Sequence, residues 1–287
     1  MNFLLASSLA LQAFVLNPTN DDGFDSSLLS AFVLSLRASQ NPPEPVEDNL
    51  KDQESSPRPT TEVPIQAQGL AVSLGSRLST YRQESSRRRP DFAKAYDGLV
   101  ERLNVIARGE IGPRLGEFMP PFDLPNEDGQ LVSLPSLLKS GPVVISINRG
   151  HWCPYCKLEL RSLAEIHGKI ERLGARVISI MPDSAQFTDG YVAQNDLPFP
   201  VLSDIDLGYS LSLGLIFWVG NKIHELYRQA GVDLEKYHGN QGYFLPMAAK
   251  FIVGRDGLVK ARQVNIEFRE RMEPEAIIEV LRDLRGS

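Results

Sequence analysis

Both cysteines of this 287-residue chain lie in one tetrapeptide, Cys153-Pro154-Tyr155-Cys156. A continuous apolar run over residues 143–147 precedes it, rich in β-branched side chains and typical of a strand buried on both faces. From Cys156 to Leu173 apolar residues recur at helical spacing, and Gly174 follows where a helix can end on a glycine. A Cys-x-x-Cys pair that joins a strand to a helix in this way strongly indicates a dithiol site.

The elements around this junction predict an α/β domain that begins after Gly116. Residues 177–180 form a second apolar run, so strand, helix and strand make a βαβ unit with two parallel neighbours. Residues 122–124 and 131–134 flank an Asp-Gly turn and predict a hairpin. Further elements are expected toward the C-terminus, namely helices at 207–213, 222–230 and 274–284 and a strand pair at 250–253 and 258–264.

The first part of the chain divides into segments of different character. Residues 1–40 hold two apolar stretches and predict a helical extension. Residues 41–67 are rich in proline and acidic side chains and lack aromatic residues, which predicts a disordered linker. The folded domain then spans 68–287, with leading helices over 68–110. In one of these helices Asp91 is the expected N-cap, and the apolar face consists of Phe92, Tyr96, Leu99, Leu103 and Ile106.

The composition excludes several classes of function. A net charge of −6 offers no basic field that would recruit nucleic acid. No apolar run reaches the ~18–20 residues that a membrane span needs. Two cysteines cannot by themselves fill a tetrahedral zinc site, and the histidines beyond His151 are scattered, so we expect neither a metal nor another cofactor. The start of the chain lacks the positive charge of a secretory signal, which favours a cytoplasmic protein.

The position of Cys153 predicts a reactive thiolate. The first turn of a helix has free N–H groups and the positive end of the helix dipole, which would lower the thiol pKa from about 8.5 into the range of about 3.5–7.5. Pro154 suits the first helical position, because it has no N–H to lose. Cys156 lies one turn away on the same side and can close a disulfide with Cys153. The alternative, two buried core cysteines, fits Cys156 on the apolar face but not Cys153.

Four neighbouring residues are assigned to the same site. Arg149 is the candidate for stabilising the thiolate and the charge of the transition state, with a surface ion pair as the alternative. Trp152 would shield the sulfur from water, or else serve as ordinary packing. Together with Pro154 and Tyr155, Trp152 is assigned to substrate binding.

Two polar neighbours receive weaker assignments. His151 could act as a base toward the adjacent cysteine, but neighbouring residues of an extended segment point apart. The helical residue Glu159 is expected to face solvent rather than to carry protons.

The sequence from Asn148 to Arg161 resembles the R-G-x-W-C-P-Y-C-x-x-E-L stretch of peroxiredoxin-like proteins in the alkyl hydroperoxide reductase/thiol-specific antioxidant (AhpC/TSA) family. The resemblance runs from about Ser79 to Leu284, and segments 116–122, 199–204 and 251–257 also carry it. It implies a thioredoxin fold with a peroxiredoxin-type N-terminal hairpin and insertions, built on a central mixed sheet flanked by helices. It also implies that Cys153 is a peroxidatic cysteine and that thioredoxin or glutaredoxin is the reductant. The expected assembly is a homodimer.

Two positions depart from the pattern of that family. Typical members carry Pro-x-x-x-Thr/Ser-x-x-Cys, in which the hydroxyl residue helps to orient the peroxide. Here Ser146 and Gly150 occupy the proline and hydroxyl positions. Relatives of this branch usually carry a proline where this chain has Ala248, and Pro246 is two residues away.

The residues and the resemblance together predict a thiol-dependent peroxidase for hydrogen peroxide or organic hydroperoxides. Cys153 would become a sulfenic acid, Cys156 would resolve it as a disulfide, and an external dithiol would reduce that disulfide. A first alternative is a thiol–disulfide oxidoreductase of thioredoxin or glutaredoxin type without peroxide turnover, which the missing Thr/Ser favours. A second is a redox-inert binding module with the same fold, for which Ala248 and Lys250 give weak support.

Overall fold

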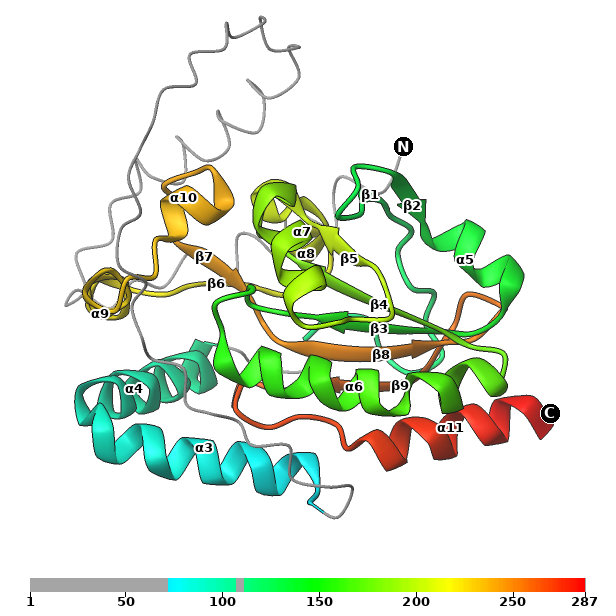
Figure 1. The fold of residues 1–287 in the computed structure, drawn as a ribbon, viewed down its shortest axis with the longest axis horizontal. Coiled ribbons are helices and arrows are strands. Elements are labelled where there is room, and N and C mark those ends of the chain that lie inside the picture. The colour runs from blue at the N-terminus through cyan, green and yellow to red at the C-terminus, as the bar shows by residue number, and fades with distance from the viewer. Residues whose placement is uncertain (1–71, 107–110, 287) are drawn as a thin grey trace, which may run out of the picture. The chain divides into compact units, whose positions relative to one another are not determined.

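A five-stranded mixed sheet forms the centre of the domain (Figure 1). In this computed structural model the described residues are 72–106 and 111–286, so the predicted extension 1–40 and linker 41–67 lie outside them. The strand order is β5-β4-β3-β8-β9. The strands are β3 (Val143–Ile147), β4 (Arg176–Met181), β5 (Val201–Ser203), β8 (Ala249–Val253) and β9 (Val259–Val264). Parallel pairing of β3 with β4 confirms the βαβ unit, and antiparallel pairing of β8 with β9 confirms the predicted strand pair.

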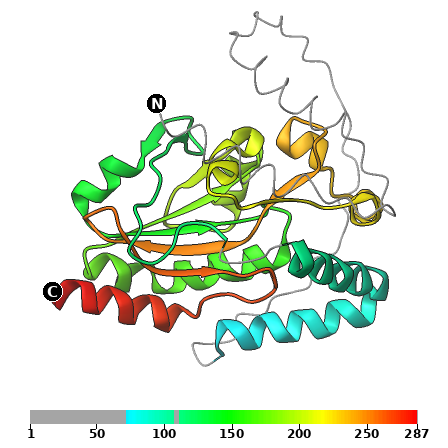
Figure 2. The same ribbon diagram turned by 180° about the vertical axis from the view of Figure 1, so that it is seen from behind.

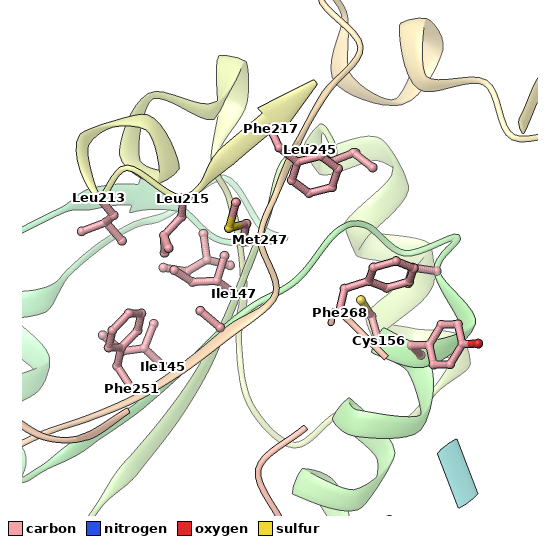
Figure 3. Close-up of a cluster of buried hydrophobic side chains, with 14 of the residues drawn as sticks. Ile145, Ile147, Cys156, Leu213, Leu215, Phe217, Leu245, Met247, Phe251 and Phe268 are labelled. Carbon is pink, nitrogen blue, oxygen red and sulfur yellow. The ribbon is translucent and has the colours of Figure 1, made fainter. Parts of the chain in front are cut away.

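Strand β3 lies in the middle of the sheet and is buried on both faces, as its apolar run predicts. Successive side chains of a strand point to opposite faces. Val144 packs into a cluster with α6 (Pro154–Arg172) and α11 (Pro274–Gly286), two helices that lie side by side (Figures 1 and 2). Ile145 and Ile147 point into a second cluster, drawn in Figure 3 with Leu213, Leu215, Phe217, Leu245, Met247 and Phe251.

Helix α6 connects β3 to β4 and confirms the helix predicted between them. Its buried face carries Leu160, Leu163 and Ile170, which belong to the cluster shared with α11. The helix ends at Arg172 with Leu173 as its C-cap, and Gly174 follows with a φ of +80°, a left-handed conformation that favours glycine. The predicted helix end is therefore confirmed.

The described residues begin with two helices, α3 (Leu74–Arg88) and α4 (Pro90–Ile106). Phe92, Leu99 and Leu103 of the apolar face predicted for α4 are buried, but the helix begins at Pro90, so the expected N-cap Asp91 lies inside its first turn. A proline can start a helix because its missing N–H would have no partner in the first turn. Helix α3 packs against α4 and α6, while α4 packs against α9 (Asn221–Gln229).

The predicted hairpin is present as β1 (Asp123–Pro125) and β2 (Leu131–Ser133). Leu134 begins α5 (Leu134–Ser140) rather than ending a strand, because the Ser133 side chain caps that helix by accepting a hydrogen bond from the Ser136 N–H. The helix predicted at 207–213 is confirmed as α8 (Gly208–Ser212). A 3₁₀ turn (η1, Ile205–Leu207) precedes it, and Leu207, the last residue of that turn, has a left-handed φ of +59°.

The sequence pattern does not predict several short elements, namely α5, α7 (Ala185–Gln194), α10 (Leu234–His238), β5, β6 (Ile216–Trp218) and β7 (Phe244–Pro246). Strands β6 and β7 pair with each other as a separate two-stranded sheet. The helices predicted near 222–230 and 274–284 are confirmed as α9 and α11. The predicted fold class, a central mixed sheet flanked by helices, is thus confirmed (Figure 2). Of the helices in the described ranges, none combines the length and apolar character needed to cross a bilayer.

Candidate active site

The segment 148–152 joins β3 to α6 and places both cysteines at the start of that helix. Cys153 is the N-cap of α6 and Pro154 is its first residue, as predicted. The Cys153 N–H donates to the Gly150 carbonyl over 3.1 Å, and the Cys153 carbonyl accepts from the Lys157 N–H over 3.0 Å. These bonds hold the backbone at the turn from strand to helix and keep Cys153 at the amino end of α6.

Both sulfurs are buried. Cys153 is 1% exposed and Cys156 is fully buried, and both are free thiols. Both cysteines belong to the larger apolar cluster, and Figure 3 draws Cys156 near Phe268 in it. The expectation that Cys153 lies off the core is wrong, because Tyr81 of α3 and Phe268 from the segment after β9 pack against the first turn of α6.

The surroundings of Cys153 favour its thiolate despite this burial. Burial is the largest influence and by itself would raise the pKa of the thiol. Hydrogen bonding by the Cys156 thiol, and then the charges of Arg149 and Arg271, act in the opposite direction. The balance lowers the pKa of Cys153 to about 6, so the residue is mainly a thiolate at neutral pH.

Cys156 has the opposite character. Burial, followed by the hydrogen bond and the negative charge of Cys153, raises the pKa of Cys156 well above its ordinary range. Two donors face its sulfur, the Arg149 backbone N–H at 3.4 Å and the Arg271 Nη2 at 3.9 Å. The reduced pair therefore consists of one nucleophile and one protonated partner.

Arg149 is fully buried, and its guanidinium carbon lies 4.0 Å from the centroid of the Phe268 ring. Its Nη2 donates a hydrogen bond to the Tyr227 hydroxyl. No carboxylate within the described ranges pairs with it, so the alternative of a surface ion pair is wrong. The charge of Arg149 instead favours the thiolate of Cys153.

Aromatic rings surround the start of α6. Trp152 packs against Tyr227 with ring centroids 4.9 Å apart, and Tyr155 packs edge-on against Tyr81 at 5.1 Å and Phe268 at 5.8 Å. Burial raises the pKa of Tyr155 to about 12, so its hydroxyl stays neutral. These rings exclude water from the helix start, while the assignment of Trp152 and Tyr155 to substrate binding stays a prediction.

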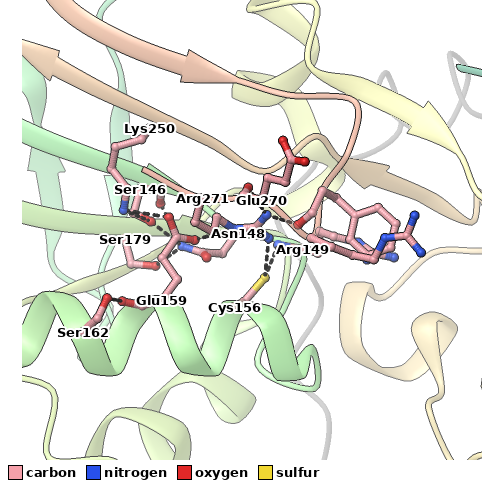
Figure 4. A network of polar contacts seen from close by, with 12 residues as sticks. Ser146, Asn148, Arg149, Cys156, Glu159, Ser162, Ser179, Lys250, Glu270 and Arg271 are labelled. Carbon is pink, nitrogen blue, oxygen red and sulfur yellow. Dashed lines mark hydrogen bonds and ion pairs between the residues drawn. The ribbon is translucent and has the colours of Figure 1, made fainter. Parts of the chain in front are cut away.

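A buried polar network lies beside Cys156 (Figure 4). Glu159 is 1% exposed and pairs with Lys250 Nζ at 3.0 Å and with Arg271 Nε at 2.9 Å. The expectation of a solvent-facing Glu159 is therefore wrong, because this side of α6 meets β8 and the segment after β9. Lys250 also donates to the Ser146 hydroxyl over 2.8 Å, which links the network to β3.

Arg271 is the site residue that sequence reasoning misses. It follows β9 in a segment without a periodic pattern and lies 115 positions beyond Cys156 in the chain. Nothing in local spacing connects it to the cysteine pair. Only the folded chain brings its guanidinium to both Glu159 and Cys156.

His151 is turned toward Asp183, two residues beyond the end of β4. Its Nδ1 lies 2.9 Å from Asp183 Oδ1, and its backbone N–H donates to Asp183 Oδ2 over 3.0 Å. The imidazole stacks on Phe187 with ring centroids 5.6 Å apart. This arrangement gives His151 a part in holding the loop before Cys153.

The backbone explains one departure from the family pattern. Gly150 has a φ of +144°, and a Cβ built on it would lie 2.4 Å from Trp152 Nε1 and 3.0 Å from Asp183 Oδ2. A threonine or serine therefore does not fit at this position. At the other departures, Ser146 is buried in the network of Figure 4 and Ala248 is buried between β7 and β8.

The residues at this site offer sulfur and guanidinium groups rather than a ligand set for a cation. Across 72–106 and 111–286, no three His, Cys, Asp or Glu side chains are grouped as a metal site would need. Arg149 and Arg271 beside the cysteines suit an anionic sulfur or an oxygen that gains negative charge.

Comparisons with known proteins agree with this geometry. Residues 115–262, just over half of the chain, match the model of the AhpC/TSA family. Among curated proteins, the chain is 33% identical over 89 residues to "Peroxiredoxin Q, chloroplastic" of Sedum lineare, covering 31% of this chain and 47% of that one. It is 32% identical over 92 residues to "Putative peroxiredoxin bcp" of Helicobacter pylori, covering 32% and 60%.

A longer match is to "Peroxiredoxin Q, chloroplastic" of Triticum aestivum, at 34% identity over 146 residues, 46% of this chain and 67% of that one. The chain spans about half of the first of these relatives and less than two thirds of the second. Among solved structures, peroxidoxin BcpB from Mycobacterium tuberculosis aligns at 18% identity with a TM-score of 0.47, over 60% of this chain and 97% of that one. The family match and these relatives establish that the chain is a peroxiredoxin-like member of the AhpC/TSA family.

Proposed function

We propose that this protein is a thiol-dependent peroxidase in which Cys153 is oxidised and Cys156 resolves the oxidised form. The observation that carries the proposal is the asymmetry of the pair. Cys153 has a pKa of about 6 at the amino end of α6, while its partner one turn along the helix stays protonated. A peroxidatic cysteine needs that thiolate, and a resolving cysteine needs that proximity.

In the first step the Cys153 thiolate attacks one peroxide oxygen. The O–O bond breaks, an S–O bond forms, and the departing oxygen takes a proton to leave as water or an alcohol. Arg149 supports this step, because its buried charge favours the thiolate and can stabilise the oxygen that gains negative charge. The product on the enzyme is a Cys153 sulfenic acid.

In the second step Cys156 attacks the sulfenic sulfur. An S–S bond forms, the S–O bond breaks, and the hydroxyl leaves as water. An external dithiol then reduces the disulfide by two thiol–disulfide exchanges. Thioredoxin or glutaredoxin is the proposed reductant, and hydrogen peroxide or an organic hydroperoxide is the proposed substrate.

A second candidate function is protein thiol–disulfide exchange without peroxide turnover. The specific observation in its favour is Gly150, which stands at the hydroxyl position of the family pattern and has no room for a side chain. The same two cysteines would act, with Cys153 as the nucleophile toward a partner disulfide.

One set of assays separates these functions. Peroxide consumption is measured with a thioredoxin couple for the wild type, Cys153→Ser and Cys156→Ser, and insulin reduction is measured on the same proteins. The peroxidase predicts turnover that Cys153→Ser abolishes, with over-oxidation of Cys153 in Cys156→Ser. Insulin reduction without peroxide turnover would support the exchange enzyme instead. If the protein shows neither peroxide turnover nor insulin reduction, the redox-inert binding module is supported.

Two further proposals follow from the sequence alone. We place the protein in the cytoplasm and propose a homodimer. Fractionation of cells that express the full chain tests the compartment. Size-exclusion chromatography with light scattering tests the assembly in both redox states.

A further inference from the structure

Arg271 joins the resolving cysteine to a buried carboxylate. Its Nε donates to Glu159 Oε2 over 2.9 Å, while its Nη2 faces Cys156 Sγ at 3.9 Å. The side chain is held in place by its Nη1, which donates to the carbonyls of Phe268 and Glu270. The guanidinium therefore has one fixed orientation, with one edge on the carboxylate and one N–H directed at sulfur.

The charges around this contact favour an anion at Cys156. Two cationic side chains, Lys250 and Arg271, share the single carboxylate of Glu159. Lys250 lies on the other carboxylate oxygen and also donates to Ser146, so Arg271 is the cation that reaches the sulfur. At Cys156 Sγ the Arg149 backbone N–H supplies a second donor, at 3.4 Å. Two donors and one charge are thus already directed at an atom that is neutral in the dithiol state.

We propose that Arg271 is a catalytic residue of the resolving step, which stabilises the Cys156 thiolate as it attacks the Cys153 sulfenic acid. This inference rests on the proposed peroxidase function and adds a residue to it. Arg271 lies outside the segment 115–262 that matches the family.

Before oxidation the negative charge lies on the Cys153 sulfur, and during the resolving step it lies on the Cys156 sulfur. In the dithiol state the Cys153 thiolate holds the negative charge, and burial together with that charge keeps the Cys156 proton in place. The sulfenic acid is neutral, so this repulsion ends when Cys153 is oxidised. Cys156 then loses its proton, its sulfur bonds to Cys153 Sγ, and the displaced hydroxide takes up a proton as water. Arg271 offsets the cost of a buried thiolate during that attack.

The test measures the two steps separately in the full chain. Reduced protein is mixed with one equivalent of hydrogen peroxide at about pH 8, where Cys153 is a thiolate. Samples quenched with a sulfenic-acid trap and with a thiol alkylator give the amounts of sulfenic acid and disulfide by mass spectrometry. For Arg271→Met we expect sulfenic acid to form but its conversion to disulfide to slow by about 10- to 100-fold.

Three further variants keep the result interpretable. Arg269→Met is the matched control, because Arg269 lies on the same segment but pairs with Asp97 and Glu267. Arg271→Lys should recover part of the lost rate, since it restores the charge. Glu159→Gln/Arg271→Met removes both charges together, and replaces Arg271→Met if that variant does not fold. The pH midpoint of the resolving step should rise in the variants without the Arg271 charge, which a purely structural role would not cause.

The outcomes distinguish this inference from the function on which it rests. If the wild type forms no sulfenic acid, the proposed peroxidase is wrong. If it forms sulfenic acid, and removal of the Arg271 charge leaves both the resolving rate and its pH midpoint unchanged, the role assigned to Arg271 is wrong. An equal loss of rate in Arg269→Met would overturn it as well.

Discussion

Gly150 has a backbone conformation that residues with a side chain rarely adopt. Its φ is +144°, and an added Cβ would meet Trp152 Nε1 at 2.4 Å. We expect Gly150→Ala to lower the free energy of unfolding by about 1–3 kcal/mol, because the strained loop or the indole must move. Denaturant unfolding of the reduced protein measures this loss.

Gly98 supplies the control for this substitution. It is an exposed residue of α4, and an added Cβ there would meet nothing within 4 Å. Gly98→Ala should therefore stabilise the protein by up to about 1 kcal/mol. Equal effects of the two alanines would contradict the strain assigned to Gly150.

The pKa of Cys153 predicts how oxidation depends on pH. With a pKa of about 6, the thiolate is present at neutral pH and is lost as the pH falls through that value. The rate of reaction with hydrogen peroxide should therefore be nearly constant above neutrality and fall by half near pH 6. Stopped-flow measurement of the first oxidation step across the acid range gives this midpoint.

Substitution of Arg149 tests whether its charge lowers the pKa of Cys153. The charge of Arg149 favours the Cys153 thiolate. In Arg149→Gln the Cys153 thiol should therefore keep its proton to higher pH, and the midpoint of its titration should rise by about one pH unit or more. Absorbance of the thiolate in the ultraviolet reports the same titration without peroxide. A midpoint that stays in place would show that Arg149 does not act on Cys153.

Near Cys153, the sequence predicts correctly the positions that depend only on the backbone of the first helical turn. The N-cap position of Cys153 and the first helical position of Pro154 follow from capping preferences within one turn. Glu159 could not be placed in this way, because its partners lie far along the chain, Arg271 at a separation of 112 positions. The burial of Cys153 likewise depends on rings contributed by α3 and by the segment after β9.

One buried carboxylate of helix α6 forms ion pairs with β8 and with the segment after β9. Glu159 balances Lys250 of β8 and Arg271 beyond β9, with all three side chains buried. Glu159→Leu leaves two buried cations without a counter-charge, so we expect a loss of about 3–5 kcal/mol in the free energy of unfolding. Thermal and urea unfolding would both record it.

The same helix carries a matched surface pair. Glu165 pairs with Arg77 of α3 at 2.8 Å but has a side chain that is 36% exposed. Glu165→Ala should cost less than about 1 kcal/mol, since solvent screens an exposed pair. A loss for Glu159→Leu as small as this would show that the buried network contributes little to stability.

At the level of elements, the predictions succeeded where the pattern was long or where a turn signal marked it, as in the β1–β2 hairpin, and they failed for several short elements without such a signal. Helices α4, α6 and α11 repeat their apolar positions over several turns, and β3 is a continuous apolar run, so the sequence pattern alone finds them. Strands β5, β6 and β7 have three residues each, too few for a period to emerge. They form because tertiary pairing, as between β6 and β7, supplies the hydrogen bonds that local preference cannot.

The domain as a whole closes over its own reactive sulfur. Cys153 is 1% exposed, and α3 covers the start of α6 through the contact of Tyr81 with Tyr155. Leu78 of α3 is buried in the same cluster as Cys153. In the proposed cycle a reductant forms a mixed disulfide with one of the two buried sulfurs, which requires that the first turn of α6 be uncovered. We expect this uncovering to occur by local detachment of α3.

Alkylation of Cys153 measures that opening directly. Leu78→Ala should reduce the packing free energy of α3 by about 2–5 kcal/mol. Each 1.4 kcal/mol by which the free energy of detaching α3 falls raises the population with an exposed Cys153 tenfold. At about pH 8, where Cys153 is already a thiolate, we therefore expect iodoacetamide to modify Leu78→Ala at least tenfold faster than the wild type. Val105→Ala on α4, at a residue that is 72% exposed, should leave the rate unchanged. Hydrogen exchange of the α3 amides should accelerate by the same factor, because both measurements report one opening. If Leu78→Ala accelerates exchange in α3 but not alkylation, the sulfur is reached by a route that does not involve this helix.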